Sequence, residues 1–164
     1  MINYLKSSIS ISSYNGCTIN CKYCILSSLG DRENVRKVED EKELVKKLLS
    51  LKLYSPEIPI SVNNQTDPLL NKKIFDSTIK ILQEMEKNEV PNPILIITKG
   101  YITDEEIKQI EKINLNIIIL YTFSGLSEKL ENRNEKTQIE TLEKLSKLKN
   151  CKLINYYRPV IEGI

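Results

Sequence analysis

The chain has 164 residues and a formal net charge of +2, from 24 lysines and arginines against 22 aspartates and glutamates, with no histidine. This length suits one domain (1–164) with a sizeable core, and the dispersed charges form no basic patch that requires nucleic acid, although nucleic acid stays open as a partner. No run of eighteen apolar residues occurs and the first residues lack the apolar core of a signal peptide, which predicts a cytoplasmic protein.

The first predicted strand leads directly into the densest group of cysteines. Residues 7–14 alternate small polar residues with isoleucine, which is typical of a strand, and Cys17, Cys21 and Cys24 follow at C-x-x-x-C-x-x-C spacing. Three thiolates this close can converge on one metal centre, whereas packing alone gives no reason to crowd them. A [4Fe–4S] cluster bound by three thiolates leaves one iron open, which an amine and a carboxylate of a small molecule could chelate.

Other roles for these cysteines are open at this point. A zinc site with Cys151 as fourth ligand is one alternative, but zinc sites usually present paired C-x-x-C or Cys/His hooks and this chain has no histidine. A disulfide framework suits a secreted protein rather than a reducing cytosol. A chance group of structural cysteines is the remaining alternative.

Helical and strand patterns then alternate along the rest of the chain. Segments with apolar residues at helical spacing among Glu and Lys alternate with short apolar runs between Pro, Gly and Asn. The predicted helices are 38–53, 72–87, 103–113 and 135–148, and the predicted strands after the first are 58–62, 93–98, 117–123 and 151–157.

Five strands alternating with four helices predict an α/β fold with a mainly parallel sheet and right-handed crossovers. A barrel and an open doubly wound sheet both fit this order. In both arrangements the loops that carry function collect at the carboxyl ends of the strands, so the cysteine loop is expected at that edge.

Cys17, Cys21 and Cys24, with the aromatic Tyr23 directly before the last cysteine, resemble the signature loop of radical S-adenosylmethionine (radical SAM) enzymes. The resemblance implies a [4Fe–4S] cluster whose open iron binds the amine and carboxylate of S-adenosylmethionine. One electron from the cluster, supplied by an external reductant of the flavodoxin or ferredoxin type, then cleaves a carbon–sulfur bond to give a 5′-deoxyadenosyl radical. The implied fold is a partial (β/α) barrel, which decides between the two arrangements above.

The loop after the second predicted strand is the other informative stretch. By the resemblance, Gln65, Thr66 and Asp67 align with the Gly-Gly-Glu-Pro loop that presents backbone carbonyls and a carboxylate to the cofactor's amino group. Both glycines are absent and an aspartate replaces the glutamate, a form closer to the branch that resembles spore photoproduct lyase. The alternative is an ordinary turn whose polar residues cap the helix 72–87.

Further cofactor contacts are expected at the ends of the later strands. By the resemblance, Ser124 approaches the ribose hydroxyls and Arg133 meets the methionyl carboxylate. Arg133 could instead belong to the solvated, charged surface. Arg158 follows the fifth strand, where its guanidinium could bind a substrate or cofactor carboxylate bidentately or pair with Glu162.

Compared with the six strands of the family's barrel, the predicted fold is truncated after the fifth parallel strand. We therefore expect the chain to be an N-terminal portion of a longer enzyme, with a partner chain or self-association that completes the barrel as the alternative. The leading hypothesis is a radical SAM enzyme core of unknown substrate, whose isolated chain is inactive if truncated. The competing hypothesis is a non-catalytic zinc or iron–sulfur binding module that serves as a subunit of a larger complex.

Overall fold

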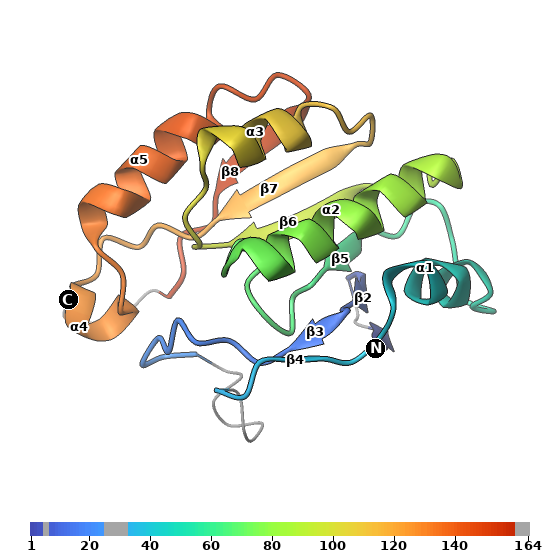
Figure 1. The fold of residues 1–164 in the computed structure, drawn as a ribbon, viewed down its shortest axis with the longest axis horizontal. Coiled ribbons are helices and arrows are strands. Elements are labelled where there is room, and N and C mark those ends of the chain that lie inside the picture. The colour runs from blue at the N-terminus through green and yellow to red at the C-terminus, as the bar shows by residue number, and fades with distance from the viewer. Residues whose placement is uncertain (5–6, 25–32, 160–164) are drawn as a thin grey trace.

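A computed structural model of the protein describes residues 1–4, 7–24 and 33–159, and Glu162 lies outside these ranges. Its main feature is a six-stranded sheet with the strand order β1-β2-β5-β6-β7-β8 (Figure 1). The strands are β1 (Ile2–Tyr4), β2 (Ile9–Ile11), β5 (Ile60–Val62), β6 (Ile94–Thr98), β7 (Ile117–Tyr121) and β8 (Cys151–Asn155).

The five strands from β2 to β8 are all parallel, as the alternation of helices and strands predicts. Only β1, at the edge of the sheet, runs antiparallel to its neighbour β2. The carboxyl ends of the five parallel strands therefore share one edge of the sheet. The loops that follow them are placed next to one another, although they are far apart in the sequence.

Helices α1 (Glu41–Leu49), α2 (Lys72–Lys87), α3 (Asp104–Ile110) and α5 (Glu135–Leu145) cover one face of the sheet (Figure 1). Each begins at a residue whose side chain accepts a backbone N–H of the first turn. These residues are Asp40, Asn71, Thr103 and Asn134. Within the described ranges, none of the helices has the length and apolar character needed to cross a membrane.

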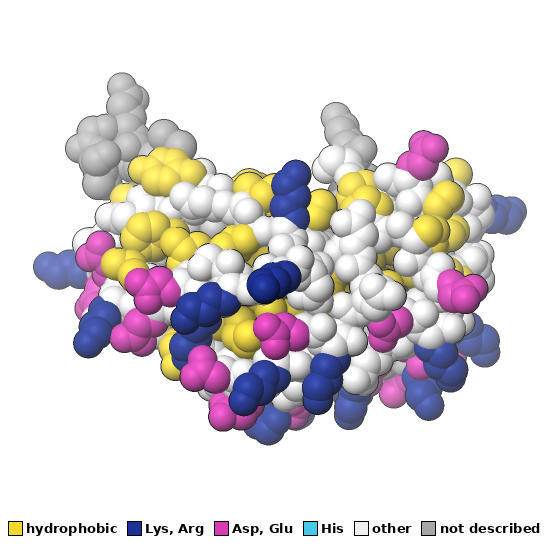
Figure 2. All heavy atoms as spheres, turned by 90° about the horizontal axis from the view of Figure 1, so that it is seen from above, with side chains coloured by type: hydrophobic (Ala, Val, Ile, Leu, Met, Phe, Trp, Pro, Cys, Tyr) yellow, Lys and Arg dark blue, Asp and Glu magenta, His cyan; other side chains and the backbone are white. Residues whose placement is uncertain are grey.

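The core lies between this layer of helices and the sheet. Along β6, Ile94 and Ile96 are buried against the helices, whereas Leu95 and Ile97 point to the opposite face and stay partly exposed. The space-filling view in Figure 2 shows charged side chains of both signs over its lower part, which is the helical side, and hydrophobic side chains gathered in its upper part. One face of the sheet is thus completed by helices, and the other presents apolar side chains at the surface.

The structure adds elements that the sequence patterns did not predict. These are β1, a two-stranded sheet of β3 (Tyr14–Asn15) and β4 (Arg36–Lys37), and the single-turn helix α4 (Glu128–Glu131). Each has two to four residues, which is too short to show a period. The predicted elements all exist: α2 has the bounds predicted for it, and the others are shorter than expected. For example, α1 begins only after Asp40 because that side chain caps it.

A close backbone contact connects two loops at the carboxyl edge of the sheet. A Cβ atom on Gly100, which follows β6, would lie 2.6 Å from both the Cβ and the carbonyl oxygen of Leu69 in the loop after β5. Only a glycine allows this approach. Gly125, after β7, serves as a control for Gly100. Its φ of +69° is left-handed, but a Cβ there would meet nothing within 4 Å.

We expect Gly100→Ala to lower the free energy of unfolding by about 3 kcal/mol, because the new Cβ overlaps backbone atoms that cannot move aside cheaply. Gly125→Ala should cost only about 1 kcal/mol, the penalty of a left-handed conformation without a clash. Denaturant unfolding of both variants and the parent chain measures the difference. Equal losses in the two variants would contradict the packing described for Gly100.

Candidate functional site

The loops after β2, β5, β6 and β7 meet at the carboxyl edge of the sheet and are joined by hydrogen bonds. The Gly16 N–H at the start of the cysteine loop donates to the Gln65 carbonyl oxygen (3.0 Å), and the Gln65 N–H donates to Ser12 Oγ (3.3 Å). Gly16 has a φ of +95°, a conformation that favours glycine. The cysteine loop and the loop after β5 are thus held side by side, as the resemblance implies.

A buried asparagine fixes the base of both loops. Asn63 Oδ1 accepts the Ser13 N–H (2.9 Å) and the Ser13 hydroxyl (3.1 Å), while Asn63 Nδ2 donates to Thr78 Oγ1 on α2 (2.9 Å). Ser13 Oγ also lies 2.7 Å from Ser77 Oγ, which donates to the Glu41 carboxylate (2.5 Å). This network ties the end of β2 to α1 and α2, so the start of the cysteine loop has a fixed position.

The three cysteines of the loop are thiols in a largely buried setting. Cys21 is buried, and Cys17 and Cys24 are partly buried. The Cys24 N–H donates to the Cys21 carbonyl (3.1 Å), which closes a tight turn between them. Burial, with the nearby Asp67 charge, raises the pKa of Cys17 to about 11, and burial also raises the pKa of Cys21. A metal centre bound here must therefore displace protons from these thiols.

The geometry distinguishes the fourth cysteine from these three. Cys151 begins β8 and lies opposite Ile117 at the start of β7, so it is at the amino-terminal edge of the sheet. The cysteine loop follows the carboxyl end of β2, at the opposite edge. Cys151 is therefore not placed to complete a zinc site with the loop cysteines. Within the described ranges, no three Cys, Asp or Glu side chains converge closely enough to hold a single metal ion.

Asp67 connects the loop after β5 to the end of β6. Its Oδ1 accepts the Thr98 hydroxyl (2.6 Å) and the Leu69 N–H (2.9 Å), and its Oδ2 accepts the Lys99 N–H (2.9 Å). Both carboxylate oxygens therefore serve to hold the two loops together. The hydroxyl of the adjacent Thr66 is buried and has no hydrogen-bond partner among the described residues, so it is a polar atom of this loop that a ligand could satisfy.

A buried polar cluster lies beside the cysteines and consists of Tyr23, Lys99, Ser124 and Glu131. Glu131 Oε1 accepts the Ser124 hydroxyl (2.5 Å) and the Tyr23 hydroxyl (2.6 Å), and it lies 3.4 Å from the Lys99 ammonium. Lys99 also donates to the Tyr23 hydroxyl. The cluster lies beside the thiols because Tyr23 directly precedes Cys24, and the charges of Lys99 and Glu131 act on Cys21.

The electrostatics of this cluster favour a charged Glu131. Burial alone would raise its pKa, but the hydrogen bonds from Ser124 and Tyr23 and the nearby Lys99 ammonium lower the pKa of Glu131 overall. The same surroundings raise the pKa of Tyr23, first through burial and then through its hydrogen bond to Glu131. The second oxygen, Glu131 Oε2, is buried and accepts no hydrogen bond from the part of the chain that the structure describes.

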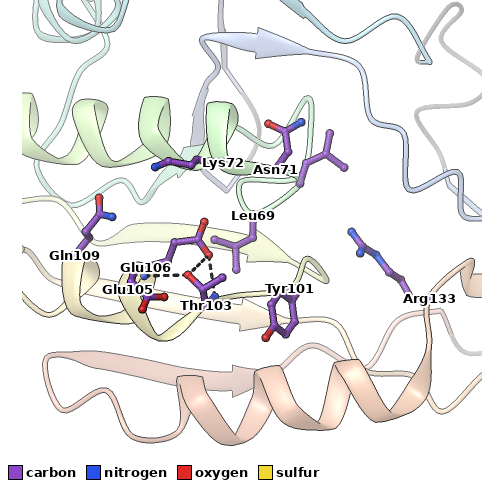
Figure 3. Close-up of a pocket in the computed structure, with 10 residues that line it drawn as sticks. Leu69, Asn71, Lys72, Tyr101, Thr103, Glu105, Glu106, Gln109 and Arg133 are labelled. Carbon is purple, nitrogen blue, oxygen red and sulfur yellow. Dashed lines mark hydrogen bonds between the residues drawn. The ribbon is translucent and has the colours of Figure 1, made fainter.

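The predicted contact residues fall into two groups. Gln65, Thr66 and Asp67 lie in the loop that touches the cysteine loop, and Ser124 belongs to the polar cluster. Arg133 instead points into a cavity of about 530 Å³ between the start of α2 and the loop before α3, together with Leu69 and Tyr101 (Figure 3).

Arg158 is exposed after β8, with its guanidinium 6.0 Å from the centre of the Tyr156 ring. The cofactor contacts of Arg133 and Arg158 therefore stay predictions. The described contacts of these two arginines are with residues outside the polar cluster.

Lys99 and Glu131 are the two residues of the polar cluster that the sequence patterns did not single out. Lys99 had a usable signal, since a lysine directly after an apolar parallel strand must lie at the edge where ligands bind. Glu131 had none, because it belongs to the unpredicted helix α4 in a region rich in Lys and Glu.

Comparison with known proteins agrees with this geometry. The family model of the Radical SAM superfamily matches residues 11–161, which includes all the loops described above. The chain belongs to the radical SAM superfamily. Among curated proteins it is 24% identical over 136 residues to the dual-specificity RNA methyltransferase RlmN of Campylobacter hominis, and 25% identical over 135 residues to that of Campylobacter jejuni. These alignments cover 81% and 79% of this chain but only 37% and 36% of the relatives.

Solved structures show the same fold. Spore photoproduct lyase complexed with dinucleoside spore photoproduct superposes with a TM-score of 0.73 at 15% sequence identity, over 99% of this chain and 49% of that one. A spore photoproduct lyase mutant with bound AdoMet and dinucleoside spore photoproduct gives a TM-score of 0.70 at 16% identity, over 93% of this chain and 46% of that one. The chain thus has the fold of a partial radical SAM barrel and spans about half the length of these structures.

Membership of the radical SAM superfamily implies a [4Fe–4S] cluster and S-adenosylmethionine, and the donor set fits that pair. A cubane needs soft thiolate ligands, and the loop has three cysteines that would provide them, each to a different iron. Convergence on a single ion is therefore not required of them. The neighbouring ammonium of Lys99 and the hydroxyl of Thr66, which bonds to no described residue, suit a ligand with a carboxylate and an amine.

We expect Asp67→Asn to lower the free energy of unfolding by about 2 kcal/mol, because the amide NH₂ would face either the Lys99 N–H or the pair formed by Thr98 and Leu69. Asp76→Asn is the matched control, since Asp76 is a half-exposed α2 residue paired with Lys72 (3.0 Å), and should change stability by less than about 0.5 kcal/mol. Denaturant unfolding of both variants and the parent chain measures these changes in the free energy of unfolding. A neutral Asp67→Asn would contradict the linking role of this carboxylate.

Proposed function

We propose that this chain is a radical SAM catalytic core in which Cys17, Cys21 and Cys24 bind a [4Fe–4S] cluster with one open iron for S-adenosylmethionine. The observation that carries the proposal is the placement of the three thiols at the carboxyl edge of the parallel sheet, beside the loop 63–70 and the polar cluster. When bound, the cluster supplies the single electron that cleaves the cofactor reductively. The role of the chain's own residues is to bind and orient the cofactor.

The polar atoms around the thiols can be assigned roles in this binding. Lys99, whose side chain is only 11% exposed, has the charge and position to bind the cofactor carboxylate. The cofactor's amino group donates hydrogen bonds to the backbone carbonyls of Gln65 and Thr66 and to the Thr66 hydroxyl. Ser124, whose hydroxyl already bonds to Glu131, lies where the family's contact to the ribose is expected.

Arg133 and Arg158 are assigned more distant parts in this proposal. Arg158 follows β8 and is exposed, so it is accessible to a carboxylate of the substrate or cofactor. For Arg133, a contact with the methionyl carboxylate requires its side chain to leave the cavity lined by Leu69 and Tyr101. We favour Lys99 over Arg133 for that contact because Lys99 donates a hydrogen bond to Tyr23 of the cysteine loop.

The proposed electron donor is an external protein of the flavodoxin or ferredoxin type. Radical SAM enzymes need such a reductant in general, and the thiols lie in a surface loop, with Cys17 and Cys24 only partly buried. A cluster in this loop is therefore close enough to the surface for electron transfer from a bound partner protein.

The test is anaerobic reconstitution with iron and sulfide. We expect a brown protein that absorbs broadly near ~400 nm and binds about four irons and four sulfides per chain, and whose spectrum changes when S-adenosylmethionine is added. Replacing any one of Cys17, Cys21 and Cys24 with alanine should remove most of the absorbance. Cys151→Ala is the matched control, and it should keep the absorbance because Cys151 lies at the opposite edge of the sheet.

The outcomes separate the two hypotheses. One equivalent of zinc after purification, with no spectral response to S-adenosylmethionine, would favour a non-catalytic binding module. A cluster that forms but does not respond to the cofactor would also count against a catalytic core, because only an open iron can respond. Loss of absorbance in Cys151→Ala alone would contradict the assignment of the three ligands.

A further inference from the structure

We infer that residues 130–132, at the end of α4, form a clamp that positions the cysteine loop, and that Glu131 is a positioning residue within it. The inference rests on the proposed function, because it concerns the loop that would hold the cluster. Neither the cysteine motif nor the loop after β5 contains these residues, which lie more than a hundred positions beyond the last cysteine of the motif.

Three consecutive residues of the clamp each hold a different point of the cysteine loop. The Leu130 carbonyl accepts the Lys22 N–H (2.9 Å), Glu131 Oε1 accepts the Tyr23 hydroxyl (2.6 Å), and Asn132 Nδ2 donates to the Ile19 carbonyl (2.7 Å). The contacts involve both main-chain and side-chain groups on both sides. Between them they fix the segment 19–23, which contains Cys21 and ends directly before Cys24.

The local structure of α4 indicates that its contacts with the cysteine loop, rather than helix formation, hold it in place. Only four residues are helical, and the N-cap Ser127 makes no capping hydrogen bond through its side chain. A single turn of this kind gains little from helix formation itself, so tertiary contacts must hold it. Asn132 ends the turn with a φ of +53°, a left-handed conformation that asparagine tolerates and that directs its amide at the Ile19 carbonyl.

Glu131 extends the clamp to two further loops. It is fully buried and accepts the Ser124 hydroxyl (2.5 Å), and it lies 3.4 Å from the Lys99 ammonium. The bonds from Ser124 and Tyr23 are shorter than the contact with Lys99. Glu131 therefore positions the cysteine loop mainly as a hydrogen-bond acceptor, and it acts on any bound group only through Tyr23 and Lys99.

The experiment measures how readily Cys21 of the metal-free full chain reacts with iodoacetamide under native conditions, with the labelled residue located by mass spectrometry. Cys21 is only 6% exposed, so its reaction requires the loop to open. Asn132→Gly keeps the left-handed backbone at no steric cost and removes only the clamping amide. We expect Cys21 to react about five- to tenfold faster in this variant, as for the loss of one hydrogen bond.

Asn88→Gly is the matched control. Asn88 also caps the C-terminus of a helix, and its amide donates to the Glu84 carbonyl (2.7 Å) within α2, where it touches no part of the site. This variant should leave the reactivity of Cys21 unchanged. An equal increase in both variants would show a general loosening of the fold and overturn the clamp.

Two substitutions of Glu131 test its role as an acceptor. Glu131→Gln can still accept the Tyr23 hydroxyl and should react at nearly the parent rate, whereas Glu131→Leu cannot accept and should raise the rate at least as much as Asn132→Gly. Parent-like protection in both Asn132→Gly and Glu131→Leu would overturn the proposal. Because the readout uses metal-free protein, a failure to bind a cluster, which would refute the proposed function, is scored separately by iron content after reconstitution.

Discussion

The site depends on one buried carboxylate. Glu131 is fully buried, and its Oε1 is satisfied by groups from three separate loops: Tyr23 of the cysteine loop, Lys99 after β6 and Ser124 after β7. A buried charge is costly unless its partners are all in place. The requirement to satisfy this carboxylate therefore brings the three loops together. One of them is the loop that contains Cys17, Cys21 and Cys24.

The parallel sheet makes this arrangement possible. Because β2, β5, β6, β7 and β8 all run in the same direction, each following loop emerges at the same edge, and residues separated by a hundred positions become neighbours. Asn63 and Asp67 then set the finer geometry, the first by tying β2 to α2 and the second by joining the loop after β5 to the end of β6. These buried side chains hold loops that would otherwise lack regular structure.

Much of this was predictable from the sequence, and the missing parts have physical reasons. The apolar runs of β6 and β7 and the capped, amphipathic helix α2 are strong local signals, and the spacing of Cys17, Cys21 and Cys24 is specific enough to name the family. The clamp was missed because α4 is a single turn stabilised by tertiary contacts, which leave no periodic pattern. The cavity position of Arg133 was missed for a similar reason, since a basic residue in a charged stretch does not show which side of the loop it faces.

The central claim is that three thiolates leave one iron open to a ligand held by the neighbouring polar groups. Mössbauer spectroscopy of protein reconstituted with ⁵⁷Fe, with and without S-adenosylmethionine, tests it most directly. We predict that the cofactor shifts the signal of one site, about a quarter of the iron, and that Lys99→Ala weakens this response while the cluster still assembles. Four iron sites that are unaffected by saturating S-adenosylmethionine would contradict the account.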